Sequence, residues 1–311
     1  MQTAIETSGL SKNFGAITAV DGINIRVDEG SVFGFLGPNG AGKTTTVRLL
    51  NGLLEPTAGT AKVLGRDIQK ESDFIRAKCG VQTDTNLYEK LTAEENLETW
   101  GMLYGIRGDE LRSRIGFLLD MFGLSDRRKD LVGKFSKGMK QKLSIARELI
   151  HDPEILFLDE PTAGLDPEAS EELLQYLKKF VEERKRTIFL CSHRLEEAEF
   201  LCDSIAVIFK GKILITGNLR ELIRNLWKEN RFTVKLKELP QKLADAMKNR
   251  DYYTADTGTA KNEIRFSVPR EDDISRVVAE LVSLNAQIQE VHRERHTLRD
   301  IYFHVLPREK V

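Results

Sequence analysis

The sequence predicts an α/β protein built around a phosphate-binding loop, with a smaller α+β domain after it. The segment GPNGAGKTT, residues 37–45, directly follows the apolar run 32–36. A strand that ends in G-x-x-x-x-G-K-[ST] is the sequence form of a P-loop, which binds nucleotide phosphates. Two unbroken apolar runs, 155–158 and 188–191, are typical of buried parallel strands. From about residue 231 the pattern changes to shorter, alternating segments.

The elements of the first part follow from local patterns. Residues 3–32 are expected to form short β segments, and the P-loop helix should begin at Gly42 and end near Gly52. Residues 57–65 should add a turn and a strand. Residues 92–150 look helical, and Thr92 with Glu95 is predicted to form a capping box.

The elements after residue 150 alternate strand and helix. A helix is expected over 168–181, between the two buried strands, and a hairpin over 205–215. Beyond residue 231 the predicted elements are a strand at 231–236, a helix at 241–248, strands at 252–255 and 263–268, a helix at 274–284 and a strand at 287–291. This βαββαβ order suits a ferredoxin-like sandwich. A short helix, 298–305, should close the chain.

Composition restricts the class of protein. The chain has 311 residues, with 47 Lys and Arg against 48 Asp and Glu, a net charge of −1. We therefore expect no nucleic-acid partner, because no global basic excess exists. No apolar stretch approaches the roughly 20 residues that span a bilayer, and no signal peptide is visible. Three scattered cysteines suggest a reducing compartment, so a cytosolic protein is the simplest expectation.

The P-loop predicts a nucleotide site formed largely by the backbone. Lys43 would place its charge at the β/γ-phosphates, and Thr44 would offer a hydroxyl ligand to Mg²⁺. The residues expected to contact the nucleotide are Gly37, Pro38, Asn39, Gly40, Ala41, Gly42, Lys43, Thr44 and Thr45.

Polar residues that follow the buried strands supply the candidate chemistry. Asp159 ends the apolar run 155–158, where a carboxylate can hold Mg²⁺ through its water shell. Glu160 is then the candidate general base for the attacking water. His193 follows the other buried strand, and strand C-termini of an open α/β sheet face the ligand. Gln82 is an amide that can reach Mg²⁺ or the water, although taken alone it carries little information.

The segment SKGMKQ, which begins at Ser136, opens the third helix of the 92–150 region. One interpretation is an N-cap Ser on a surface helix. The other is a second phosphate-binding helix N-terminus, with the small Gly138 at the point of close approach. A single nucleotide does not need two such ends within one chain. If both are used, the second should serve a nucleotide bound to a partner subunit.

Together these segments resemble the nucleotide-binding subunit of an ABC transporter. GPNGAGKTT, Gln82, FSKGMKQKLSIARELI, ILFLDEPTAGLDP and Ser192-His193 match the order of the Walker A, Q-loop, signature, Walker B, D-loop and H-loop series over roughly residues 3–220. The resemblance implies an ABC ATPase fold over 1–222, with a RecA-like core, an antiparallel β subdomain and a helical subdomain at about 88–150. Residues 223–311 would form the accessory α+β domain.

The resemblance also implies roles for single residues. Glu160, His193 and Gln82 would be catalytic, and Thr44, Gln82 and Asp159 would hold Mg²⁺. Asp166 belongs to the D-loop, which communicates between the two subunits of the dimer. Phe14 occupies the position of the aromatic residue that stacks on adenine, the alternative being an ordinary core residue.

The partners implied by the resemblance are a second copy of the chain and integral-membrane permease subunits. Two ATP molecules would lie between one subunit's P-loop and the other's Ser136 helix. The subunit would sit on the cytoplasmic face of the cell membrane through the permease.

The signature departs from the usual family form, which has Gly and Gln where this chain has Lys137 and Met139. Met139 cannot complete a capping box with Ser136. The FSKGM form and the C-terminal extension resemble those of exporters with a separate type-two permease.

The alternative is a soluble ABC-type ATPase that clamps a ribosome or nucleic acid, although such proteins usually carry two cassettes or a long coiled coil. For residues 231–311 two roles are open, support of dimerisation and binding of a small regulatory ligand.

Overall fold

The computed structural model describes residues 2–83, 86–247, 250–257 and 262–307. The chain divides into two compact units, residues 1–219 with 302–311, and residues 220–301. This division lies close to the predicted boundary at 222–223 and differs from the prediction in assigning residues 302–307 to the first unit.

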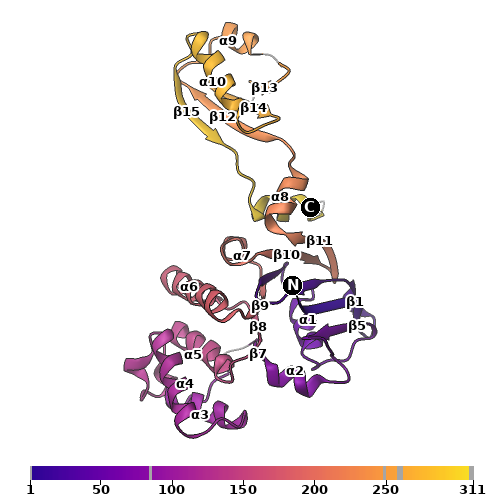
Figure 1. Cartoon of the computed structure of the whole chain (residues 1–311), viewed down its shortest axis with the longest axis vertical. Helices are drawn as coiled ribbons and strands as arrows, with labels where there is room; N and C mark the ends of the chain where they lie inside the picture. Colours follow the sequence, from indigo (N-terminus) through magenta and orange to yellow (C-terminus); the bar gives the residue numbers. More distant parts are fainter. Residues whose placement is uncertain (1, 84–85, 248–249, 258–261, 308–311) are drawn as a thin grey trace. The chain divides into compact units, whose positions relative to one another are not determined.

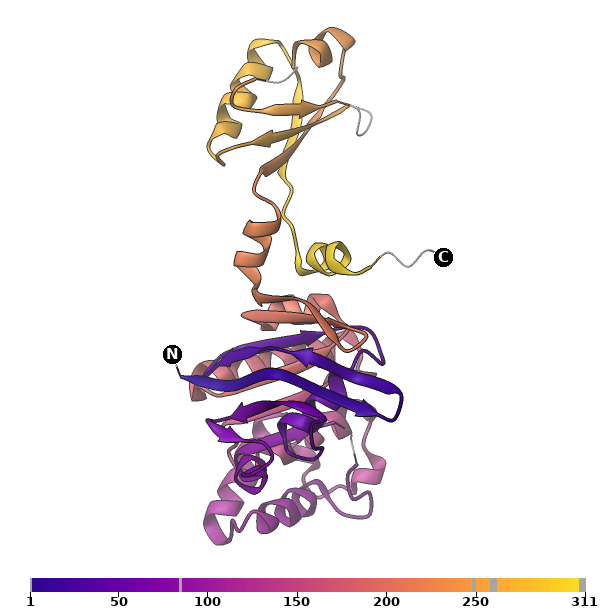
Figure 2. The ribbon, with the colours of Figure 1, turned by 90° about the vertical axis from the view of Figure 1, so that its right-hand side faces the viewer.

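The first unit contains two sheets (Figure 1). The N-terminal sheet has the order β2-β1-β5-β6, with β3 also paired to β1; Figure 2 shows its indigo strands broadside. Its strands are β1 (Thr3–Phe14), β2 (Ile17–Ile23), β3 (Arg26–Asp28), β5 (Ala58–Val63) and β6 (Arg66–Asp67). All of its pairings are antiparallel, as the short β segments of the sequence predict.

The second sheet carries the P-loop and has the order β11-β10-β4-β9-β8-β7. Five of its strands are parallel, and β11 is added antiparallel at one edge. The strands are β4 (Val32–Leu36), β7 (Cys79–Gln82), β8 (Ile155–Asp159), β9 (Thr187–Ser192), β10 (Ser204–Phe209) and β11 (Lys212–Asn218). Strands β4 and β9 are buried along their whole length, which explains their unbroken apolar sequences.

Helices surround this sheet and form a separate layer at one end. The helical layer consists of α3 (Ala93–Leu103), α4 (Gly108–Met121) and α5 (Lys137–Leu149), which contact one another. Its first helix begins with the predicted capping box, because Thr92 accepts from the Glu95 N–H and Glu95 bonds back to the Thr92 N–H. The other helices of this unit are α1 (Lys43–Leu50), α2 (Ser72–Lys78), α6 (Pro167–Arg184) and α7 (Leu195–Leu201). The sequence patterns had not indicated α2 and α7.

The second unit is the expected βαββαβ sandwich. Its elements are β12 (Asn230–Leu236), α9 (Gln241–Ala246), β13 (Thr254–Asp256), β14 (Glu263–Val268), α10 (Asp273–Ser283) and β15 (Ile288–Arg293). The sheet order β13-β14-β12-β15, antiparallel throughout, is that of a ferredoxin-like fold. Apolar residues of both helices and of β12 and β14 form its core. The predicted end of α9 at Lys248 lies outside the described residues.

Two helices lie at the boundaries of this unit. Helix α8 (Leu219–Leu226) starts at the first boundary, and α11 (Leu298–Val305) crosses the second. None of the helices in the described part of the chain combines the length and apolar character that a bilayer crossing requires.

Candidate nucleotide site

The P-loop joins β4 to α1, and its shape is fixed by the backbone. Gly42 is the N-cap of α1 with a φ of 111°, a conformation that suits glycine, and a Cβ there would lie 2.3 Å from the carbonyl oxygen of Ala19. At Gly37 a Cβ would lie 2.3 Å from the carbonyl oxygen of Ile208. These positions therefore admit only glycine without a backbone shift.

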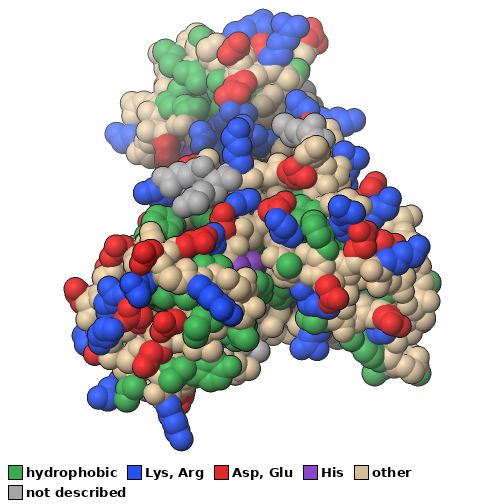
Figure 3. All heavy atoms as spheres, turned by 60° about the horizontal axis from the view of Figure 1, so that its bottom comes forward, with side chains coloured by type: hydrophobic (Ala, Val, Ile, Leu, Met, Phe, Trp, Pro, Cys, Tyr) green, Lys and Arg blue, Asp and Glu red, His purple; other side chains and the backbone are tan. Residues whose placement is uncertain are grey.

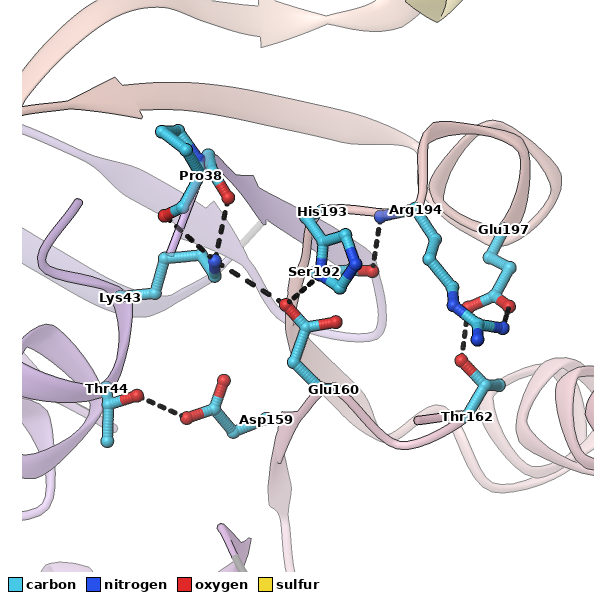
Figure 4. Close-up of polar contacts among 11 residues, drawn as sticks. Pro38, Lys43, Thr44, Asp159, Glu160, Thr162, Ser192, His193, Arg194 and Glu197 are labelled. Carbon is cyan, nitrogen blue, oxygen red and sulfur yellow. Dashed lines mark hydrogen bonds and ion pairs between the residues drawn. The ribbon is translucent and has the colours of Figure 1, made fainter. Parts of the chain in front are cut away.

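Lys43 is held inside the loop that precedes it. Its Nζ donates to the carbonyl oxygen of Gly37 at 2.7 Å and to that of Pro38 at 3.3 Å, and it lies 3.5 Å from Oε1 of Glu160 (Figure 4). The side chain is only 6% exposed. An ammonium group in this position can bind an anion that enters the loop.

Thr44 and Asp159 bring a hydroxyl and a carboxylate together from α1 and the end of β8. The Thr44 hydroxyl donates to Oδ2 of Asp159 at 2.5 Å. Burial raises the pKa of the Asp159 carboxyl, and the hydrogen bond from Thr44 opposes that shift. A partly buried carboxylate beside a hydroxyl is a donor set that suits Mg²⁺, which usually binds one or two carboxylates together with water and phosphate oxygens.

Glu160 has an unusual backbone conformation for a non-glycine residue. Its φ is 53°, and its N–H donates to the carbonyl oxygen of Cys191 at 2.9 Å. Its Oε1 accepts from Nδ1–H of His193 at 2.8 Å. Its Oε2 is buried and has no hydrogen-bond partner among the described residues. Left-handed backbone at such a residue costs about 1–3 kcal/mol, and such strain is concentrated at functional sites.

Gln82, at the end of β7, is 2% exposed, and its Oε1 also lacks a hydrogen-bond partner within the described part of the chain. It lines a cavity of about 570 Å³ together with the P-loop and the two acidic residues. The residues that line the cavity are Ala19, Asn39, Gly40, Gly42, Lys43, Thr44, Thr45, Gln82, Thr83, Asn86, Lys137, Gln141, Asp159, Glu160 and Ala163. The structure thus brings together predicted site residues from three separate segments: the P-loop, the end of β7 and the end of β8.

Other predicted residues lie outside that lining. Gly37 and Pro38 act through their carbonyl oxygens on Lys43, and Ala41 is part of the hydrophobic core. Phe14 is 48% exposed, so the alternative of an ordinary core residue is wrong. Asp166 is the N-cap of α6, where its side chain accepts from the Ala169 N–H at 2.8 Å.

The start of α5 has the geometry of an open helix N-terminus. Ser136 is the N-cap, exposed, and its hydroxyl accepts from the Met139 N–H at 3.2 Å. A Cβ at Gly138 would meet no atom closer than 3.6 Å, so internal packing does not require glycine there. This end of α5 therefore fits the interpretation of a surface built for close approach.

Sequence reasoning missed several residues around the site. Gln141 lines the cavity from the same face of α5 as Lys137, which the comparison of the signature had already singled out, and their i, i+4 spacing could have indicated this placement. Thr162 donates to Glu197 at 2.5 Å, and Arg194 donates to the same carboxylate at 2.8 Å (Figure 4). This network joins the chain after Glu160 to the helix after His193. No local pattern in the sequence points to it.

Metal ligation here would depend on few protein groups. Among the described residues, no cluster of three or more His, Cys, Asp or Glu side chains is placed to hold a metal ion. A Mg²⁺ ion that enters with nucleotide phosphates does not require one.

Comparisons with known proteins find a matching family model and relatives that span most of the chain. A family model described as ABC transporter matches residues 20–163. The chain is 44% identical to the bacitracin transport ATP-binding protein BcrA of Bacillus licheniformis over 215 residues, which cover 69% of each protein. It is 36% identical to the daunorubicin resistance ATP-binding protein DrrA3 of Streptomyces coeruleorubidus, covering 97% of this chain and 96% of that protein.

A solved structure shares the fold. It is the dimeric structure of a post-hydrolysis state of the ATP-binding cassette MJ0796 bound to ADP and Pi, with a TM-score of 0.63 and 28% identity. The match covers 69% of this chain and 98% of that one. These similarities favour a transporter ATPase over the soluble clamp.

Proposed function

The chain belongs to the ABC transporter family as an ATP-binding and ATP-hydrolysing subunit, and on that basis we propose that two copies close around two ATP molecules to drive an exporter. Each ATP would lie between the P-loop of one copy and the Ser136 end of α5 of the other. The observation that carries this proposal is that Glu160, whose buried Oε2 has no partner among the described residues, lines the same cavity as Lys43 and Thr44.

The chemistry follows from the positions of four side chains. Lys43, with the N–H groups of the loop and of the first turn of α1, would bind the β- and γ-phosphates. Glu160 would accept a proton from the attacking water through Oε2, while His193 holds the carboxylate by Oε1. The second ring nitrogen of His193 would then be available to hydrogen-bond the γ-phosphate.

Thr44, Asp159 and Gln82 are the residues that would hold Mg²⁺. When bound, the ion would neutralise negative charge that develops on the phosphates during hydrolysis. The raised pKa of Asp159 fits this role, because a cation nearby would favour the ionised form that burial disfavours.

Through dimer closure, the γ-phosphate would control the equilibrium between the open and the closed dimer. A ligand that contacts both copies binds the closed state more tightly than the open state, and its removal by hydrolysis reverses that preference. The dimeric cassette with ADP and Pi supports the proposed partner. ATP is supplied by the cytoplasm, so the subunit would work on the cytoplasmic face of the membrane.

We place the permease contact on the helical layer near Gln82. Met102, Leu103 and Tyr104 at the end of α3 and Phe117 of α4 are exposed apolar side chains, with Leu103 71% exposed. Figure 3 shows apolar side chains interspersed with charged ones over this face. Exposed apolar side chains surrounded by charged ones are typical of protein interfaces. The relatives named for bacitracin transport and daunorubicin resistance support the export direction.

The test is the variant Glu160→Gln in the full chain. It should lower kcat by about 100-fold or more, since the general base is lost. It should also accumulate an ATP-bound dimer, measured by light scattering after gel filtration with ATP. The matched variant Glu98→Gln, on an exposed part of α3, should turn over normally. Undiminished turnover by Glu160→Gln would refute the assignment of the base.

A further inference from the structure

Strand β7, which ends in Gln82, is packed against the last turns of α5. It is an edge strand that pairs only with β8 in the described sheet. A Cβ at Gly80 would lie 2.5 Å from the carbonyl oxygen of Glu148, so strand and helix backbones are in close contact. His151 hydrogen-bonds the carbonyl oxygen of Cys79 at 3.2 Å, and burial lowers the pKa of this histidine to about 4. The imidazole is therefore neutral at physiological pH.

Two adjacent charged residues of α5 contact the chain on either side of Gln82. Arg147 and Glu148, here called the α5 ion pair, are 7% and 4% exposed and lie 2.8 Å apart. Oε2 of Glu148 accepts from the Val81 N–H at 3.2 Å, just before Gln82. Nη1 of Arg147 donates to the carbonyl oxygen of Asn86 at 2.6 Å, after Gln82. The pair thus bonds the backbone at both ends of the segment that carries this glutamine.

Stability alone does not explain a buried ion pair. Removing two charges from water is costly, and apolar residues of similar volume are often equally or more stable in such a place. The Val81 N–H of an edge strand does need an acceptor, which the Glu148 carboxylate supplies. The arrangement is thus better suited to fixing the position of the backbone than to adding stability.

The α5 ion pair is also in contact with α3. The guanidinium of Arg147 lies 4.6 Å from the ring centroid of Trp100, a cation–π contact. Trp100 precedes Met102 and Leu103, which are exposed on the same helix. Contacts therefore link Trp100, two residues before the exposed Met102, through Arg147 to the chain on either side of Gln82.

We propose that Arg147 and Glu148 are positioning residues that set the location of Gln82 in the nucleotide cavity. They act on the reaction through Gln82 and connect its position to that of α3. The proposal rests on the proposed ATPase function of this site. It assigns no contact with nucleotide to the pair itself.

Two variants of the full chain test this proposal. Arg147→Lys keeps the charge but loses the fork that reaches Glu148 and Asn86 together. The double variant Arg147→Met with Glu148→Leu removes both charges and keeps the volume. Each should lower kcat about tenfold with KM for ATP changed less than about twofold, because misplacing a group in the site affects the reacting state more than binding. The double variant also leaves the Val81 N–H without its acceptor, so its Tm should fall. The split between kcat and KM is therefore the readout that separates a positioning role from a purely structural one.

A double-mutant cycle shows whether the effect passes through Gln82. In a Gln82→Ala background, neither change at the α5 ion pair should lower kcat further. Losses that multiply in that background, or a double variant with wild-type kcat, would overturn the proposal. Arg112→Lys is the matched control, because Arg112 forms an exposed ion pair with Asp109 on α4. A wild-type chain that hydrolyses no ATP would instead defeat the proposed function.

Discussion

The P-loop and the start of α5 are both suited to phosphate, but only the P-loop is explained by the packing of its own chain. Gly37 cannot carry a side chain without displacing the Ile208 carbonyl, and Lys43 is buried against the loop. A Cβ at Gly138 would make only ordinary contacts, none closer than 3.6 Å, and Ser136 is exposed. A glycine that the packing of its own chain does not require is compatible with the close approach of a partner's nucleotide, as we propose. The difference supports a site completed by a second copy.

Alanine substitutions at Gly37 and Gly138 should show the largest difference between the P-loop and the start of α5, in their effects on stability. Gly37→Ala should destabilise the nucleotide-free protein by about 1–3 kcal/mol through overpacking. Gly138→Ala should leave stability unchanged or raise it by up to about 1 kcal/mol, because alanine favours a helix. Unfolding in urea measures both changes. The comparison breaks if Gly138→Ala destabilises the chain as much as Gly37→Ala does.

Gly138→Ala should nevertheless lower the ATPase rate of the stable protein. The added methyl group would stand where the partner's nucleotide approaches. Steady-state kinetics at protein concentrations above and below the dimerisation midpoint would show the loss. A variant with wild-type kcat at all concentrations would remove Gly138 from the site.

Phe14 tests how far the P-loop half of the site extends. Phe14→Ala should weaken ATP binding about fivefold, or about 1 kcal/mol, because an aromatic stacking contact of that size is lost. Stability should change little, since the side chain is half exposed. Ile17→Ala is the matched control, because Ile17 is exposed and pairs with Phe14 in the sheet. Equal effects of the two variants on ATP titrations would exclude Phe14 from the adenine site.

The smallest expected effect is that of Asp159 on the pH dependence of the unfolding free energy. Burial raises its folded-state pKa above the unfolded value, so the neutral carboxyl stabilises the fold at low pH. That stability is lost as the pH rises through the folded pKa. Asp159→Asn should therefore have a larger free energy of unfolding than the wild type at pH 7, and the same free energy of unfolding below about pH 4.

The measurement is the unfolding free energy of the nucleotide-free protein at the two pH values. Asp126→Asn, at an exposed aspartate, is the matched control. If Asp159→Asn is less stable than the wild type at pH 7, the ionised carboxylate stabilises the fold even without a bound cation, which contradicts the prediction.

The sequence predicted the features that depend on local patterns. The P-loop, the capping box at Thr92 and the β8 carboxylates each depend on residues close together in the chain, where backbone geometry and strand burial decide the outcome. Residue spacing also predicted the βαββαβ order of the second unit. The N-cap at Ser136 was predicted for the same reason.

The features that were missed depend on residues far apart in the chain. Arg147 and Glu148 look like an ordinary polar stretch of a helix, and only the packing of α5 on β7 places them beside Gln82. The Thr162–Glu197 contact likewise joins two segments with no shared pattern. The left-handed backbone of Glu160 could not be inferred either, because no residue type demands it there.

Mixing two inactive variants tests the shared site most directly. Lys43→Ala would disable the P-loop half, and Gly138→Asp would place a negative charge at the α5 half. In a mixed dimer, the intact P-loop of one copy faces the intact α5 of the other, so one complete site forms. Equal mixtures should recover about a quarter of wild-type ATPase activity, since half of the dimers are mixed and each has one of two sites. No recovery, with mixed dimers demonstrated by affinity tags, would contradict a site shared between copies.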